Sequence, residues 1–202
     1  MIGAYGAVLA FVVLALPWTR HALERVMIGH MLVQIPLLVV TGVLMVRALP
    51  PALTARLSKW NAGGVSGMLL ALIASSWWMV PRALDSALAS PAMEVAKFVT
   101  LPLLVGVPLA LSWGALGGIG RGFVIANVLP MWAVVGWAYM VAPVRVCNYY
   151  LVDQQVVAGL GLLNLSVALG IATALMAFRP QSARPLGEHS GKKWRRATSR
   201  PT

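Results

Sequence analysis

The chain has 202 residues, of which 59% are hydrophobic and only 10% are charged, and its mean hydropathy is +0.81. A soluble domain carries about 25% charged residues, so the composition excludes an ordinary water-soluble globule and indicates an integral membrane protein. The net charge of +11 is concentrated at one end, because seven of the 16 Lys and Arg residues lie in 179–202. This distribution argues against nucleic acid as a partner.

Six apolar segments are long enough to cross a bilayer, which takes about 17 to 25 helical residues. They are approximately 2–18, 26–46, 65–80, 98–116, 123–141 and 156–178. The start of the chain lacks the basic residues and cleavage site of a secretory signal, so the first helix is expected to be retained and to run on toward Thr19. The sequence therefore predicts an all-α transmembrane helical bundle over 1–178, followed by a basic tail, 179–202, whose polar composition predicts disorder.

The positive charges predict the orientation of these spans, since cytoplasmic loops carry the excess of Lys and Arg. With the basic tail in the cytoplasm, six spans place the N-terminus there too. The inner side then holds 11 of the 16 basic residues and the outer side holds five, together with four of the five acidic residues. The tail itself serves as a topology anchor or binds anionic lipid or a partner.

The second span carries one candidate metal site. At about 100° per residue, Met27, His30 and Gln34 share a face. Imidazole and thioether groups suit Cu(I), so copper would bind His30 with Met27 or Met31 as a sulfur ligand, and His21 could join from the loop. The alternative is that His30 forms hydrogen bonds between helices while the methionines fill space.

The outer loop before the last span contains several polar residues close to a helix start. Asp153 is expected to cap the last helix, and Gln154 and Gln155 follow it. Tyr149 is typical of the aromatic belt at a membrane surface. Cys147, the one cysteine, excludes an internal disulfide and is either a soft metal ligand or inert packing.

The outer loop between the third and fourth spans begins with Trp77 and Trp78, which are expected at the interface. Pro81 opens an amphipathic stretch whose polar side includes Asp85. It predicts a helix on the outer surface, which could be a lid over the bundle or a docking face. The sequence contains no HExxH, Walker or GxSxG motif, so we expect no enzyme.

Three segments resemble the CtaG-like cytochrome c oxidase assembly factors, a bacterial multi-pass family linked to copper delivery. The matching strings are GHMLVQIPLLVVTG at 29–42, WWMVPRALDSALASP at 77–91 and DQQVVAGL at 153–160. They occur in the family's order, and the resemblance extends over 20–178. It implies a protein of the bacterial cytoplasmic (inner) membrane, with His30, Met31, Asp153, Gln154 and Gln155 in the family's positions.

The chain also departs from the pattern of that family. The family typically has a second histidine where this chain has Val26, and a His-rich segment where this chain reads PAMEVAKF, with Glu94, Lys97 and Phe98 at those places. The comparison therefore predicts a branch that keeps the scaffold with a changed ligand or partner.

Three functions remain open at this point. The first is a membrane assembly or accessory factor, or chaperone, for a respiratory oxidase, handling copper at its outer face with an oxidase subunit or a periplasmic copper protein as partner. The second is a non-catalytic membrane subunit that docks a redox partner through the outer loop containing Asp85, Trp77 and Trp78. The third is a small transporter or channel, against which the few charged residues within the spans count.

Overall fold

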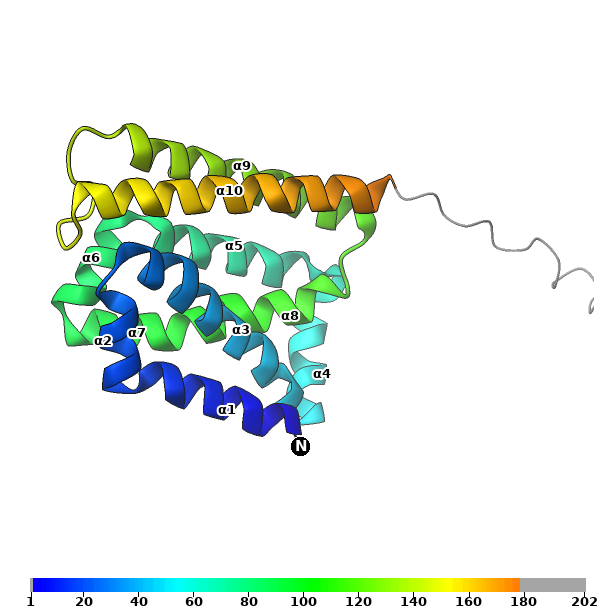
Figure 1. Ribbon diagram of the computed structural model, residues 1–202. Helices are drawn as coiled ribbons and strands as arrows, with labels where there is room; N and C mark the ends of the chain where they lie inside the picture. Colours follow the sequence, from blue (N-terminus) through cyan, green and yellow to red (C-terminus); the bar gives the residue numbers. More distant parts are fainter. Residues whose placement is uncertain (1, 179–202) are drawn as a thin grey trace, which may run out of the picture. The chain divides into compact units, whose positions relative to one another are not determined.

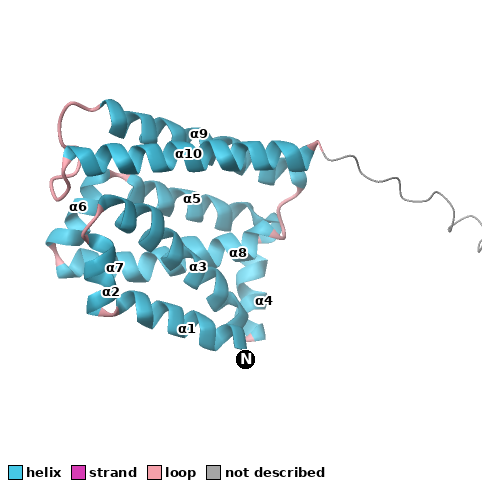
Figure 2. Cartoon of the chain, viewed as in Figure 1, coloured by secondary structure: helices cyan, strands magenta, loops and turns pink. Residues whose placement is uncertain are grey.

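The computed structural model describes residues 2–178, and the predictions made for the tail lie outside them. The described residues are helices joined by short loops, with no strand among them (Figure 2). The chain divides into two compact units, 1–168 and 169–202. Of the second unit, 169–178 is described, and the last helix ends within it at Ala177. The first unit contains every other element and all the contacts discussed below.

The elements follow one another along the chain as shown in Figure 1. The α-helices are α1 (Ile2–Ala15), α2 (Pro17–Glu24), α3 (Ile35–Met45), α4 (Pro51–Trp60), α5 (Val65–Met79), α6 (Pro81–Ala89), α7 (Pro91–Thr100), α8 (Val107–Trp113), α9 (Gly118–Val141) and α10 (Val152–Ala177). Two segments, η1 (Gly29–Gln34) and η4 (Leu101–Gly106), are π-helical, and two short turns, η2 (Val46–Ala48) and η3 (Ala62–Gly64), are 3₁₀-helical.

Within residues 2–178, five continuous stretches are long and apolar enough to span a membrane, and the chain is a multi-pass membrane protein. They are Gly29–Ala48, Ala62–Met79, Pro91–Trp113, Gly118–Val141 and Val152–Ala177. A sixth span exists if the bent pair Tyr5–Ala15 and Pro17–Glu24 is counted as one. The predicted all-α transmembrane class is thereby confirmed.

The first helix is shorter than expected. It ends at Ala15, and α2 leaves at 65° to it, so the expectation that it runs on toward Thr19 was wrong. The cause is Pro17, which pushes the preceding residue out of the helical region, and Leu16 accordingly has ψ 134°. Helices α4, α6 and α7 also begin with proline at their first position, which suits the fixed φ of that residue. The amphipathic helix α4 had not been predicted.

Glycines allow two pairs of helical segments to touch along their backbones. A Cβ on Gly42 of α3 would lie 2.2 Å from the Pro102 carbonyl oxygen of η4, and one on Gly106 would lie 2.3 Å from the Val39 carbonyl oxygen. Gly136 of α9 and Gly159 of α10 meet in the same way. Close approach at small residues is a common way to pack helices in a bilayer, where the hydrophobic effect between them is weak.

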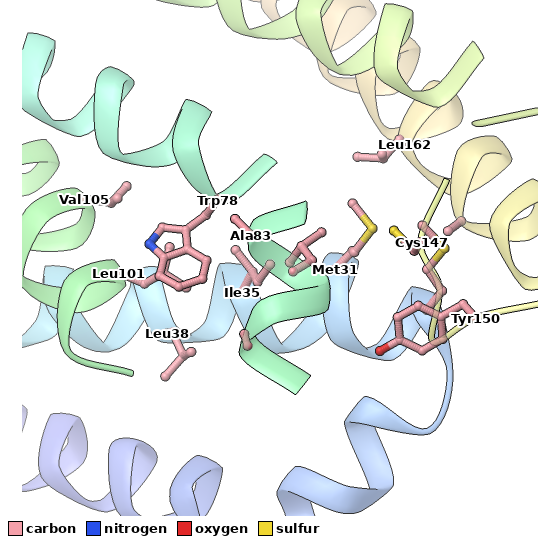
Figure 3. Packing of buried hydrophobic residues seen from close by; sticks show 14 of the residues in the cluster. Met31, Ile35, Leu38, Trp78, Ala83, Leu101, Val105, Cys147, Tyr150 and Leu162 are labelled. Atoms are coloured by element: carbon pink, nitrogen blue, oxygen red, sulfur yellow. The ribbon is translucent and has the colours of Figure 1, made fainter. Parts of the chain in front are cut away.

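The main buried core of the first unit takes residues from α1, η1, α3, α5, α6, α7, η4, α9 and α10 and from the loop before α10. Figure 3 shows it running from Val105 and Trp78 to Cys147 and Tyr150. Trp78 is buried, and its indole N–H donates to the Thr100 hydroxyl at 2.9 Å. The buried polar contacts of Glu24, Lys97 and Asp85 lie at the end of the unit formed by α2, α6 and the loop 142–151, which is on the left in Figure 1. We call this the polar end.

Candidate functional site

A fully buried lysine organises the polar end. The Lys97 side chain has no exposed surface, and its ammonium contacts three acceptors: the Glu24 carboxylate Oε1 at 2.7 Å, the Gln34 Oε1 at 3.0 Å and the His30 Nε2 at 3.1 Å. An ammonium has three N–H donors, so each is matched to one acceptor. Because a buried charge needs both a counter-charge and hydrogen bonds, this arrangement satisfies the lysine within the protein.

The hydrogen bonds around the cluster define the state of the His30 ring. The Tyr150 hydroxyl donates to the Glu24 backbone carbonyl at 3.0 Å, so its oxygen accepts from His30 Nδ1–H at 2.9 Å. The opposite nitrogen, Nε2, carries no proton and accepts from Lys97. His30 is therefore neutral and protonated on Nδ1. We refer to Lys97, Glu24, His30, Gln34 and Tyr150 as the Lys97 cluster.

Four separate elements supply these side chains. Glu24 ends α2 and Lys97 lies in α7. His30 and Gln34 both come from the π-helix η1, in which the Ile35 N–H donates to the His30 carbonyl five residues back. Pro36, which cannot donate a hydrogen bond, follows directly. Such π turns are rare and are often found at functional sites, and here the turn presents His30 and Gln34 to the same ammonium.

The loop 142–151 covers the cluster and is fastened at three points. The Asp85 carboxylate in α6 accepts from the Asn148 backbone and side-chain N–H groups at 2.8 and 3.0 Å. Gln155 in α10 accepts from the Val146 N–H at 2.8 Å and donates to the Tyr139 carbonyl at 3.0 Å. The third point is the Tyr150 hydroxyl, which is hydrogen-bonded to the Glu24 backbone carbonyl and to His30. Each fastening residue is buried, so the loop is part of the packed structure.

The loop also holds two side chains whose ionisation is suppressed. Cys147 is buried and free, and burial raises the pKa of its thiol to about 11, with the Asp85 carboxylate adding to the effect. Burial likewise raises the pKa of the Tyr150 hydroxyl above its ordinary value, helped by the charge of Glu24. Cys147 is therefore a protonated packing residue at neutral pH, which favours the second of the two roles considered for it.

A cleft of about 380 Å³ opens beside the cluster. Its charged and polar lining includes Arg20, His21, Glu24, Arg25, Glu94 and Tyr150. Arg20 and Glu94, both in this lining, form an ion pair at 2.8 Å. Glu24 and Tyr150 belong to both the cleft and the cluster, and the Glu24 side chain is 12% exposed. The carboxylate is thus the point at which the buried network meets the surface.

The structure places the other expected site residues unevenly. Met27 and Met31, which are three residues before and one residue after His30 in the sequence, are buried. His21 is exposed and lines the cleft. Helix α10 begins at Val152, so the expectation that Asp153 caps it was wrong. Asp153 is exposed within the first turn, where its negative charge interacts favourably with the helix dipole.

The remaining expected residues differ in burial. Gln154 is half-buried and Tyr149 is exposed. The expected surface helix exists as α6, but Asp85 and Trp78 are buried.

The copper site expected around His30 does not fit this arrangement. Both ring nitrogens already have partners, and the nitrogen that would bind a metal faces an ammonium at 3.1 Å. Among residues 2–178, no three His, Cys, Asp or Glu side chains lie close enough together to hold a metal ion. Copper binding by this chain remains a prediction, and it requires Lys97 to withdraw.

Sequence reasoning missed Lys97 and Glu24 as site residues. Glu24 had been assigned to the outer side because the second span was expected to begin at Val26, and Lys97 because the fourth was expected to begin at Phe98. Helix α7 begins instead at Pro91, so Lys97 lies within the span Pro91–Trp113. The available signal was the proline itself, which favours a helix start, together with one lysine and one glutamate flanking apolar segments.

Comparison with known proteins gave no matching family model, no matching curated protein and no matching solved structure.

Proposed function

We propose that this protein is a non-catalytic accessory or assembly factor of the bacterial cytoplasmic membrane that serves a respiratory oxidase. The observation that carries the proposal is the convergence of the three segments that resemble the CtaG-like factors. His30 and Gln34 come from 29–42, Asp85 comes from 77–91, and Gln155 comes from 153–160. Through Lys97, Asn148 and Val146, these residues build one covered site at the polar end.

The Lys97 cluster supports a role in recognition. Ionisable groups inside a membrane protein are costly and mark functional sites by default. Here a neutral histidine, a lysine and a carboxylate are held without exposure except at Glu24, which opens into the cleft. A partner that contacts the cleft would meet a rigid surface whose charges are already placed, which lowers the entropic cost of binding.

A more specific form of this proposal is that the protein handles copper through His30. It requires the Lys97 ammonium to leave His30 Nε2, where it stands in the position of a metal ion. We therefore favour the version in which the lysine, and no copper, occupies the site. Titration of Cu(I) into the purified protein distinguishes the two: no difference in binding between the wild type and His30→Ala supports the lysine version, and a His30-dependent site in the wild type supports copper.

The test of the assembly role is deletion of the chain from its host. We expect a lower content of assembled oxidase, measured from the haem absorption spectrum of membranes, and slower oxygen consumption. Complementation with the wild type should restore both. Lys97→Met should restore less than Lys59→Met, a matched change on the exposed face of α4, when both variants are compared at equal membrane levels. An unchanged oxidase content after deletion would contradict the proposal.

A docking subunit is the second candidate, and one observation favours it. Trp77 is 61% exposed and Tyr149 is 56% exposed, both near the polar end, and exposed aromatic residues are common binding anchors. The changes that test it are Trp77→Ala and Tyr149→Ala, because Asp85 and Trp78 are buried and their loss would disturb the fold. Loss of a co-purifying redox protein on these two changes, with His30→Ala without effect, would support docking; retention of that protein would count against it.

A further inference from the structure

The surroundings of the Lys97 ammonium have the chemistry of a metal site. Its three acceptors are a carboxylate oxygen, an imidazole nitrogen and an amide oxygen, at 2.7, 3.1 and 3.0 Å. Carboxylate and imidazole are the common protein ligands of divalent first-row metals, and amide oxygen is an accepted additional one. The three converge on one point, and the atom at that point carries a positive charge.

The hydrogen-bond partners that orient these three acceptors are also those found around the ligands of a metal site. A metal-binding histidine almost always donates its other N–H to an oxygen atom, which fixes the ring and its tautomer. His30 does this through Nδ1 to the Tyr150 oxygen, and Tyr150 is itself fixed on the Glu24 carbonyl. The Glu24 carboxylate is held in turn by the Gln34 side-chain N–H at 3.0 Å. The ligands are therefore oriented by neighbours other than the lysine.

We propose that Glu24, His30 and Gln34 form a cation site that the Lys97 ammonium fills from within the chain. The lysine neutralises the carboxylate and supplies the three contacts that a bound metal ion would make. A metal ion entering beside it would bring a second cation to within hydrogen-bond distance of the first, which the buried site would oppose. The wild type is thus independent of metal at this site, and loss of the ammonium converts the site into one for a divalent metal ion.

This inference does not depend on the proposed link to an oxidase, because it concerns the side chains alone. It accounts for the three acceptors of different chemistry that converge on one buried ammonium. It also explains how a lysine can lie with no exposed surface inside a span: the site gives it the ligands of a cation.

The experiment is a titration of Co²⁺ into detergent-solubilised full-length protein, followed by visible absorption and by thermal unfolding. Co²⁺ reports its own coordination through its spectrum. Lys97→Ala should bind one Co²⁺ at least 100-fold more tightly than the wild type and should unfold at a higher temperature when Co²⁺ or Zn²⁺ is present. Lys97→Ala combined with His30→Ala should lose both effects. Lys59→Ala is the matched control and should behave as the wild type does.

Two further measurements keep the test decisive. If Lys97→Ala does not fold alone, Lys97→His supplies a third strong ligand and should give the same His30-dependent spectrum. The wild type should show no change in unfolding temperature with chelator. The proposal is overturned if the wild type binds Co²⁺ through His30 as tightly as the variants do, or if both folded variants show no His30-dependent binding.

Discussion

Replacement of Lys97 by methionine removes the ammonium and keeps an unbranched side chain of similar length. The change leaves the Glu24 carboxylate without its counter-charge, and His30 Nε2 and Gln34 Oε1 without their donor. In this structure Lys97 is the cluster side chain that donates to Nε2, and the Tyr150 hydroxyl is committed to the Glu24 carbonyl on the other side of the ring.

Breaking a buried ion pair by removing one partner costs about 3–5 kcal/mol. The lower end applies here, because Glu24 is 12% exposed and keeps the Gln34 side-chain N–H. We therefore expect a loss of about 3 kcal/mol, which for a chain of this size lowers the unfolding temperature by about 6–12 °C. Removing the stranded charge as well, in Lys97→Met with Glu24→Gln, should recover part of the loss, with a coupling of about 1–3 kcal/mol.

Thermal unfolding in one mild detergent, followed by far-UV circular dichroism, measures these differences. Lys59→Met on the exposed face of α4 is the control and should change the free energy of unfolding by no more than about 0.5 kcal/mol. The reasoning is refuted if Lys97→Met unfolds at the wild-type temperature, or if its loss simply adds to that of Glu24→Gln.

Three further predictions concern the packing and the covering loop. Gly42→Ala would force a Cβ to 2.2 Å from the Pro102 carbonyl oxygen, so we expect about 1–3 kcal/mol of destabilisation by overpacking. Gly122→Ala in α9, with nothing within 4 Å of the added Cβ, should cause no loss of stability in the same unfolding assay, because alanine is the better helix former. Because burial raises the Cys147 pKa to about 11, iodoacetamide should label the native thiol negligibly at pH 8 and increasingly as the pH rises toward 11; rapid labelling at pH 8 would contradict the burial. Gln155→Leu leaves the Val146 N–H and the Tyr139 carbonyl without their partner. It should lower the free energy of unfolding by about 1–3 kcal/mol for each buried group and make Cys147 labelling faster. An unchanged labelling rate would show that Gln155 does not hold the loop in place.

The transmembrane class was predictable because apolar length is a direct physical requirement of the bilayer. Five of the six expected spans overlap continuous helices, with ends displaced by up to seven residues, the largest shift being the start of the fourth span at Pro91. The exception is the first, where Pro17 bends the chain by 65°. Hydropathy alone does not register that bend, because proline changes the backbone and leaves the apolar character of 2–18 almost unaltered.

The site was only partly predictable. The sequence singled out His30 and Gln34 because they share a face of an apolar helix, and both lie in the cluster. Lys97 was placed in a loop because a charged residue is expected to end a span. The structure keeps it inside because its charge is satisfied by Glu24, 73 residues away in the chain. A pairing between distant segments depends on tertiary packing, which periodicity along one helix does not report.

The covering loop illustrates the same limit. Asp153 was expected to act at the start of the last helix, since acidic residues commonly do. The residue that acts there is Gln155, which reaches back to Val146 and Tyr139. Likewise Asp85, expected on a polar surface, turns inward to Asn148. In both cases the partner is a backbone group whose position is set by the fold, so no local pattern could identify it.

The most direct test of the account is the protonation of the His30 ring, measured by ¹⁵N NMR of histidine-labelled protein in detergent, with the His30 signals assigned by their loss in His30→Gln. The structure predicts a neutral ring with a proton on Nδ1, an unprotonated Nε2 that accepts from Lys97, and a change in the Nε2 signal in Lys97→Met but not in Lys59→Met. A proton on Nε2, a doubly protonated ring, or an Nε2 signal indifferent to Lys97 would contradict the claim that the lysine fills this site.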